Sequence, residues 1–241
     1  AVTGLLTALH RVARDKPALM REHLDVFVRH ATSTDQPHAQ ISTYASWSVD
    51  ELAQMVLSGR LDYVLSGVCG DATPSAEFGL TWRAVAVDAV FVLMPETHPL
   101  AAHDEVHLAA LSEERWAAAP GDGCFESCFI AACARAGFTP RKIYETDIRS
   151  CIDLVEAGEA VALAQATFRP VAGLVTRPLA NAPLRWRLLL GWHPDSPAAE
   201  NADRVLGHAI AAYNDSLSRN PHYLAWLSRN PSFGARNLAA A

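Results

Sequence analysis

The sequence has no long hydrophobic run and little charge of either sign. Its longest apolar stretches, Ala84–Met94 and Val161–Ala166, are far shorter than the roughly 18 residues that a membrane-spanning helix needs. Only 19% of the 241 residues are charged and 50% are hydrophobic, which is typical of a folded globular chain. The formal net charge of -6 repels a phosphate backbone, so this chain by itself is predicted not to bind DNA.

An export signal is also missing from the first residues, which lack a basic region, a continuous apolar segment and a small-residue cleavage site. The cysteines are odd in number and sit inside apolar patterns: Cys69, Cys124, Cys128, Cys133 and Cys151. This usage indicates reduced thiols rather than a disulfide framework. We therefore expect a cytoplasmic protein without membrane contact.

Motifs for catalysis and for phosphate binding are absent, since there is no G-x-S-x-G, no G-x-G-x-x-G and no G-x-x-x-x-G-K. Cys124 and Cys128 share a spacing of four, but no second pair and no histidine at ligand spacing follows. His98, His103 and His107 fall in a predicted loop and short helix, where a solvated surface is the expected role. No catalytic residue, no metal and no cofactor is predicted. The cysteines are expected to be buried small hydrophobes, with redox sensing through Cys124 at a helix start as the alternative.

Two segments have the pattern of a strand, a helix ended by glycine and a second strand. In the first, Ser48–Glu51 forms a predicted capping box, Gly59 ends the helix and Leu61–Leu65 is a buried strand, with Ala39–Tyr44 as the strand before it. The second runs from Ile143 to Gln165, with Gly158 ending its helix. This arrangement predicts βαβ units in two similarly wound lobes.

The remaining regular segments are read from periodicity and from breaker residues. Gly137 is expected to end a helix, and the repeated tetrapeptide SRNP at Ser218–Pro221 and Ser228–Pro231 is expected to form helix-ending turns. The predicted elements are a strand at Ala84–Leu93, a short helix at Leu108–Glu114, a helix at Cys124–Ala136, a strand at Leu184–Trp192 and a helix at Asn201–Leu217.

An ordered set of segments resembles the effector-binding domain of LysR-type transcriptional regulators. The segments are LSGRLDYVL at Leu57–Leu65, VLMPETHPLA at Val92–Ala101, VHLAAL at Val106–Leu111 with Trp116, AGFTP at Ala136–Pro140, LVEAGEAVAL at Leu154–Leu163 and TRPL at Thr176–Leu179. The resemblance covers roughly Ala39 to Trp192. It departs from the family at Glu159, where a glycine is usual, and at Ala164 and Gln165, where a proline is common.

The resemblance implies an α/β fold with two Rossmann-like lobes of the type 2 periplasmic-binding-protein kind, joined by two crossover segments near Leu93–Pro95 and Arg177–Leu184. Residues 1–94 and 184–241 would form regulatory lobe I, and residues 95–183 lobe II. It also implies a homodimer or higher homo-oligomer, with the helix at Asn201–Leu217 as a candidate surface. DNA would be bound only through a winged helix-turn-helix domain that this chain does not contain.

The family holds a small effector in the cleft between its lobes, which agrees with the rule that open α/β sheets bind ligands beyond the carboxyl ends of their strands. Strand-to-helix junctions offer free N–H groups and hydroxyls there, which suit a small polar or anionic metabolite. For each junction an ordinary helix cap or turn is the alternative. The candidate effector-binding residues are Thr3, Gly4, Ser46, Trp47, Ser48, Gly67, Gly121, Asp122, Cys124, Phe125, Thr146 and Asp147.

Two other functions stay open. An extracytoplasmic solute-binding protein would have the same fold, but the five cysteines and the missing export signal weigh against it. A small-molecule enzyme on this scaffold would need an acid and base set converging in the cleft. The effector, the promoter and the direction of the response are beyond what the sequence specifies.

Overall fold

The computed structural model describes residues 44, 46, 48–72, 74, 76–118, 124–141, 143–168, 170–218 and 220–235. The chain divides into two compact units, one made of the described parts of Ala1–Val87 and Arg187–Ala241 and the other of Asp88–Trp186. The units meet between Val87 and Asp88 and between Trp186 and Arg187. The predicted lobes meet instead at 94/95 and 183/184, and these lobe bounds stay a prediction. In the described residues no helix has the length and apolar character needed to cross a membrane.

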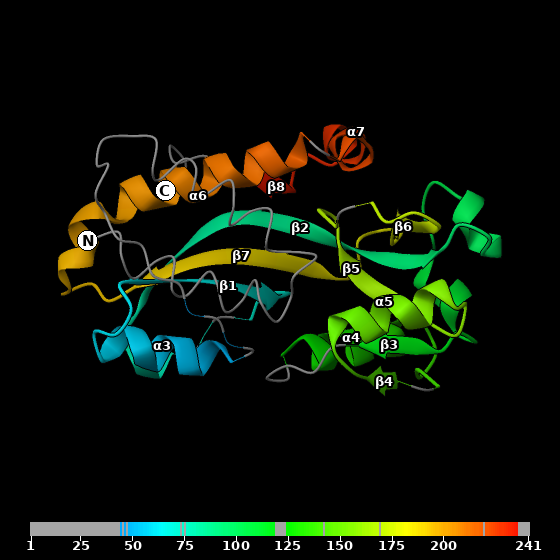
Figure 1. Ribbon diagram of the computed structural model, residues 1–241, viewed down its shortest axis with the longest axis horizontal. Helices are drawn as coiled ribbons and strands as arrows, with labels where there is room; N and C mark the ends of the chain where they lie inside the picture. The colour runs from blue at the N-terminus through cyan, green and yellow to red at the C-terminus, as the bar shows by residue number, and fades with distance from the viewer. Residues whose placement is uncertain are drawn as a thin grey trace. The chain divides into compact units, whose positions relative to one another are not determined.

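Unit 1 is built on three neighbouring strands, β1 (Tyr63–Cys69), β7 (Arg185–Trp192) and the first part of β2 (Thr81–Pro95), in the order β1-β7-β2 (Figure 1). Its helices are α3 (Val49–Leu57), α6 (Ala202–Leu217) and α7 (Pro221–Arg229), with short 3-10 helices η1 (Ala76–Phe78) and η4 (Pro197–Asn201). A two-residue strand, β8 (Gly234–Ala235), pairs antiparallel with β2. β1 begins two residues later than predicted and extends to Cys69, so Gly67 lies inside the strand.

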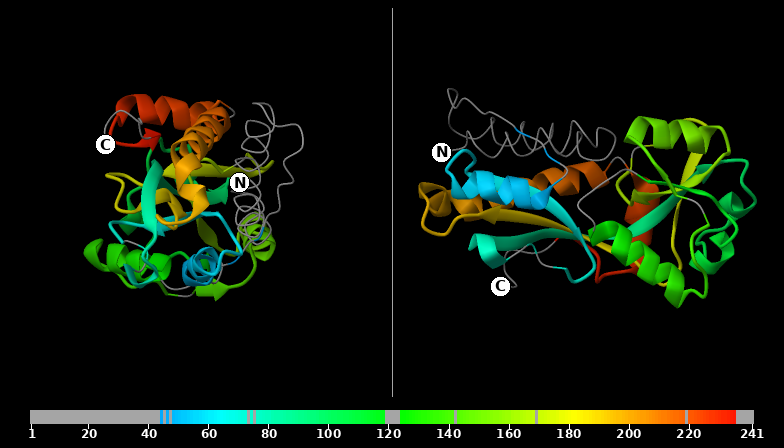
Figure 2. Two further views of the ribbon diagram at one scale, coloured as in Figure 1. Left: turned by 90° about the vertical axis from the view of Figure 1, so that its left-hand side faces the viewer. Right: turned by 90° about the horizontal axis from the view of Figure 1, so that it is seen from below.

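Unit 2 has a mixed sheet. β3 (Trp116–Ala118) lies between β4 (Ile143–Glu145) and β5 (Val161–Gln165) and is parallel to both, whereas β5 and β6 (Leu174–Pro178) run antiparallel to the second part of β2. The right-hand view of Figure 2 shows α4 (Cys124–Arg135) and α5 (Ile148–Glu156) on opposite sides of these strands. The 3-10 helices η2 (Pro99–Ala102) and η3 (Leu108–Leu111) complete the unit.

Three helices end as the glycine pattern predicted. Gly59, Gly137 and Gly158 all have positive φ, which a residue without Cβ adopts at little cost. After α3, Arg60 N–H donates to Met55 C=O, and Gly59 N–H to Val56 C=O. The same pair of bonds follows α4 and α5, so each helix closes in a Schellman motif that satisfies its last carbonyls.

The repeated SRNP segments bracket α7, a helix that the sequence reading missed. Asn220 begins α7 by accepting the Tyr223 N–H on its side-chain oxygen at 3.0 Å, and Pro221 takes the first helical position, where no N–H is needed. Asn230 ends the helix, and its side-chain amide donates to Trp226 C=O at 2.9 Å. One tetrapeptide therefore ends α6 and begins α7, and the other ends α7.

The core of unit 1 is closed by two contacts that reach the strands from distant parts of the chain. The Tyr63 hydroxyl in β1 donates to Ala198 C=O in η4, and burial raises the pKa of this phenol to about 12, so it stays a donor. Arg187 in β7 donates from Nε to Gly70 C=O at 2.9 Å and from its guanidinium to Ala72 C=O. These bonds fix the loop that follows β1.

A close approach between β7 and β2 makes a glycine necessary at position 191. A Cβ on Gly191 would lie 2.5 Å from Cζ3 of Trp82, well inside van der Waals contact. We predict that Gly191→Ala lowers the free energy of unfolding by about 1–3 kcal/mol, because the strand and the indole must move apart. Urea unfolding of the full chain measures this.

The same experiment on Gly191→Ala combined with Trp82→Ala tests the cause. Removing the indole opens the space that the new methyl group needs, so the two changes together should cost less than the sum of their separate effects. Additive losses would show that the Gly191 substitution acts in some other way.

Candidate functional site

The start of α3 joins two of the predicted site residues, Ser46 and Ser48. Ser48 is the N-cap, and its Oγ accepts the Glu51 N–H at 3.2 Å, as a capping box requires. The reciprocal half runs through Ser46, whose Oγ accepts the Ser48 N–H at 3.1 Å and donates to the Glu51 carboxylate. The Tyr44 hydroxyl donates to the same carboxylate at 2.7 Å. Ser46 is thus part of the helix cap, and a Ser46→Ala change would disturb α3 as well as a ligand.

The start of α5 joins Thr146 and Asp147. Thr146 N–H donates to Ala118 C=O at 3.0 Å and continues the pairing of β4 with β3. The Asp147 carboxylate accepts N–H groups of Arg149 at 2.9 Å and Ser150 at 3.2 Å, and the Ser150 hydroxyl at 2.6 Å. The Ser150 hydroxyl bond is the largest cause that lowers the pKa of Asp147, followed by the backbone bond from the same residue. Asp147 is therefore ionised and caps the helix.

Both helix starts present carboxylates, whereas free N–H groups were expected at the junction of Ser46–Ser48, and Thr146 and Asp147 were expected to contact the effector from a strand. Asp50 and Glu51 lie in the first turn of α3, and Asp147 precedes α5. Negative side chains at a helix N-terminus use its donors and its positive dipole end. A ligand carboxylate would meet like charge at both places, so an anion is not favoured by the described junctions.

Other predicted site residues have different positions or lie outside the described part of the chain. Gly67 is an interior residue of β1, because that strand runs on to Cys69, and it does not mark the strand end. The residues or side chains outside the description are Thr3, Gly4, Trp47, Gly121, Asp122, Cys124 and Phe125. Ser46, Ser48 and Gly67 belong to unit 1, and Thr146 and Asp147 to unit 2.

A further hydroxyl in unit 2 was missed by the sequence reading. Thr167 follows β5 by two residues, is 8% exposed, and its Oγ1 has no hydrogen-bond partner among the described residues. β4 and β5 are both parallel to β3, so Thr146 and Thr167 follow the carboxyl ends of strands about 10 Å apart in one sheet. The signal available in the sequence was a threonine just past a buried strand, as at Thr146.

Most of the described cysteines are buried. Cys69, Cys133 and Cys151 are buried, as predicted, and Cys128 is half-buried. Burial raises the pKa of Cys133 to about 11 and, together with the nearby charge of Asp147, that of Cys151 to about 11. Both are protonated and poorly nucleophilic at neutral pH. Among the described residues, no group of three or more His, Cys, Asp or Glu side chains is arranged to hold a metal ion.

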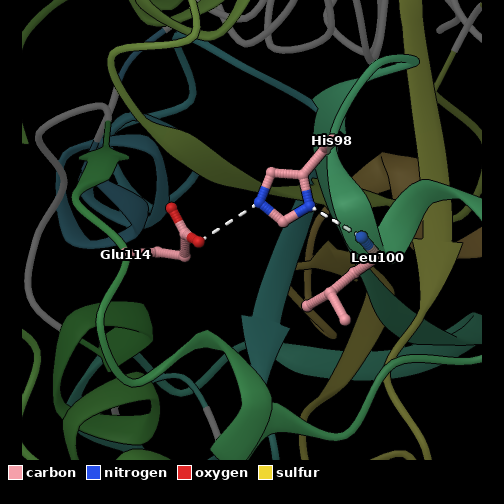
Figure 3. A network of polar contacts seen from close by, with 3 residues as sticks. All are labelled: His98, Leu100 and Glu114. Carbon is pink, nitrogen blue, oxygen red and sulfur yellow. Dashed lines mark hydrogen bonds and ion pairs between the residues drawn. The ribbon is translucent and has the colours of Figure 1, made fainter.

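His98 is not the solvated surface residue that we expected. Its side chain is 12% exposed; Nδ1 accepts the Leu100 N–H at 3.1 Å, and Nε2 lies 3.2 Å from Glu114 Oε1 (Figure 3). Because Nδ1 accepts, the neutral ring carries its proton on Nε2 and donates it to the carboxylate. The side chain caps η2 and joins it to the segment after η3, which is a structural role.

We predict that His98→Ala lowers the free energy of unfolding by about 1–2 kcal/mol, since the cap and the Glu114 contact are both lost. His98→Asn supplies an acceptor for Leu100 N–H but is too short for Glu114, so it should recover about half of the loss. Thermal or urea unfolding of both variants measures the difference. Equal stability of the wild type and His98→Ala would contradict this role.

A separate prediction concerns Thr167. A buried hydroxyl without a partner costs about 1–3 kcal/mol, and valine has the same shape without the polar atom. Thr167→Val should therefore leave the unfolding midpoint unchanged or raise it, whereas an ordinary packed threonine would lose stability. Thr176→Val, a half-buried position in β6 of the same unit, is the control. A clear loss of stability in Thr167→Val alone would show that its hydroxyl has a partner.

The comparisons with known proteins agree with this fold. A family model described as the LysR substrate binding domain matches residues 30–213. Among curated proteins, the small neutral protease regulatory protein of Streptomyces coelicolor is 37% identical over 142 residues, which cover 58% of this chain and 43% of that protein. This chain spans about half the length of the curated relatives that it matches.

Solved structures show the same architecture at low identity. A mutant of OxyR from Corynebacterium glutamicum with hydrogen peroxide bound has a TM-score of 0.70 at 15% identity, covering 85% of this chain and 65% of that one. The reduced regulatory domain of OxyR from Pseudomonas aeruginosa has a TM-score of 0.66 at 14% identity, covering 80% of this chain and 93% of that one. At these identities the likeness shows the fold, an α/β fold of the periplasmic-binding-protein kind. With the family match spanning most of its length, the chain belongs to the LysR substrate-binding-domain family.

Proposed function

We propose that this chain is the effector-sensing part of a LysR-type transcriptional regulator that works in the cytoplasm as a homodimer or higher homo-oligomer. The family match and the regulatory names of its relatives support this role. DNA would be bound by a winged helix-turn-helix domain outside these residues. Effector binding would alter promoter occupancy, which requires a ligand with different affinities for two states of the protein.

The observation that carries the ligand proposal is the buried, unpartnered hydroxyl of Thr167 beyond the carboxyl end of β5. Open α/β sheets bind ligands at this edge, where Thr146 also follows β4. A ligand oxygen or nitrogen that bonds Thr167 would satisfy the orphan hydroxyl. We propose that the effector contacts Thr146 and Thr167 beyond the carboxyl ends of β4 and β5 in unit 2.

The chemistry of the described helix starts favours the polar alternative over the anionic one. Asp147 already accepts the first N–H groups of α5, and Glu51 lies in the first turn of α3. A neutral hydroxyl, amide or protonated amine can bond beside these carboxylates, whereas a carboxylate ligand is repelled. An anionic effector would have to depend on Thr3, Gly4, Gly121, Asp122, Cys124 or Phe125.

We infer that the chain binds its ligand without converting it chemically. The described cysteines Cys133 and Cys151 are held as neutral thiols, and His98 is engaged in capping η2. An enzyme on this scaffold would place an activated nucleophile or a poised acid and base beside the ligand. The two alternatives differ in one observable, the recovery of unchanged ligand after incubation with the protein.

A thermal-shift screen of uncharged polar metabolites, amines and carboxylates tests the proposal. Any hit is then titrated against the wild type, Thr146→Val, Thr167→Val and the control Thr176→Val. Loss of one hydrogen bond to a neutral group costs about 1 kcal/mol, so each of the first two variants should weaken binding roughly fivefold, while the control binds normally.

Full affinity in both Thr146→Val and Thr167→Val would contradict this site. Chemical conversion of the hit, followed by mass spectrometry of the ligand, would contradict the binding role and favour the enzyme. A preference for carboxylates over amines and neutral compounds would move the ligand contacts away from the described helix starts.

A further inference from the structure

The C-terminal segment Asn220–Ala235 lies beyond the residues matched by the family model, which end at 213. It contributes α7 and β8 to unit 1. Tyr223 and Trp226 are buried, with ring centroids 6.0 Å apart, and Phe233 meets Trp226 edge to face at 5.0 Å. All three rings belong to this segment, so the cluster holds Phe233, the residue before β8, on α7.

β8 pairs with β2 at the last two residues of that strand in unit 1. Ala235 pairs with Ala86 and Gly234 with Val87, and Val87 is the last residue of β2 that belongs to unit 1. From Val90 onward the partners of β2 are β5 and β6, which belong to unit 2. Figure 1 shows β8 above β2 and β7 below it. β8 therefore pairs with β2 immediately before the strand passes from one unit to the other.

The backbone at Gly234 is suited to this pairing only as glycine. Its φ is +96°, a conformation that strains any residue with a Cβ, and Leu227 of α7 lies 3.5 Å from where that Cβ would be. The residues that β8 covers, Ala86 and Val87, are buried in the strand. Without β8, their backbone groups on that edge would need other partners.

We propose that Asn220–Ala235 is a C-terminal clasp on β2 that sets how readily the strand bends where it passes between the units. Any bend of β2 at Val87–Asp88 would shift the pairs that Ala86 and Val87 form with β8, and the packing of Phe233 on Trp226 would oppose that shift. The second crossing, Trp186–Arg187 in β7, lies in the strand beside β2 and is expected to move with it. The clasp acts whether or not an effector is present, so it goes beyond the proposed function.

Hydrogen exchange of the full chain measures this. Gly234→Ala strains the backbone of β8, and Phe233→Ala removes its packing on Trp226 without backbone strain. Both should speed exchange roughly tenfold in peptides that cover Ala86–Val90 and Trp186–Leu188, because local opening of both crossings becomes easier. Protection of α3 and β1 should stay as in the wild type.

Gly59→Ala is the matched control, since it places the same kind of strain at a positive φ of +68° in unit 1, at the end of α3. Three results would overturn the clasp. Faster exchange could be confined to α7 and β8, it could appear equally in Gly59→Ala, or both C-terminal variants could exchange at the crossings like the wild type. The first would leave β8 as a passive edge strand, and the second would reflect lower stability of the whole unit.

Discussion

Both units of this protein depend on one strand, β2. Its residues from Val85 to Met94 are all buried, including the carboxylate residue Asp88, so the strand is covered on both faces. Its edges pair with β8 before the crossing and with β5 and β6 after it, and β7 is its neighbour in the sheet. Because a 15-residue strand contributes to two hydrophobic cores, neither unit can form its sheet without it. Trp82 of β2 lies so close to Gly191 of β7 that the neighbouring strand must also fit β2.

The helix starts show how local chemistry limits the ligand. A helix N-terminus offers donors and a positive dipole end, and it is often occupied by a bound anion. Here Ser48 and Asp147 accept N–H groups at those helix starts from within the chain, and Glu51 places a carboxylate in the first turn of α3. In unit 2 the ligand contacts that we propose are instead two threonine hydroxyls, those of Thr146 and Thr167, which follow strands β4 and β5. Polar hydrogen bonding, rather than charge attraction, is the recognition that this arrangement supports.

The repeated helix-and-strand pattern explains why the family resemblance was visible in the sequence. Gly59 and Gly158 occupy equivalent Schellman positions after α3 and α5, and a buried strand follows each. These features are local, because a helix-ending glycine and an apolar run each depend on residues that are adjacent in the sequence. The family extends this regularity over residues 30–213. The segment with α7 and β8 lies outside the matched residues. Its helix was not predicted, because the two SRNP copies were interpreted only as turns.

The sequence alone determined the helices ended by glycine, the buried strands, the family and the burial of most described cysteines, because each depends on local periodicity and composition. Tertiary structure decided the rest. The proton on His98 is fixed by Leu100 and Glu114, the second distant in sequence. Ser46 is part of the helix cap because its hydroxyl donates to the Glu51 carboxylate. The Thr167 hydroxyl lacks a hydrogen-bond partner among the described residues because neighbouring segments bury it. Hydrogen-bond partners and burial depend on which segments meet in space, and no spacing along the chain specifies that.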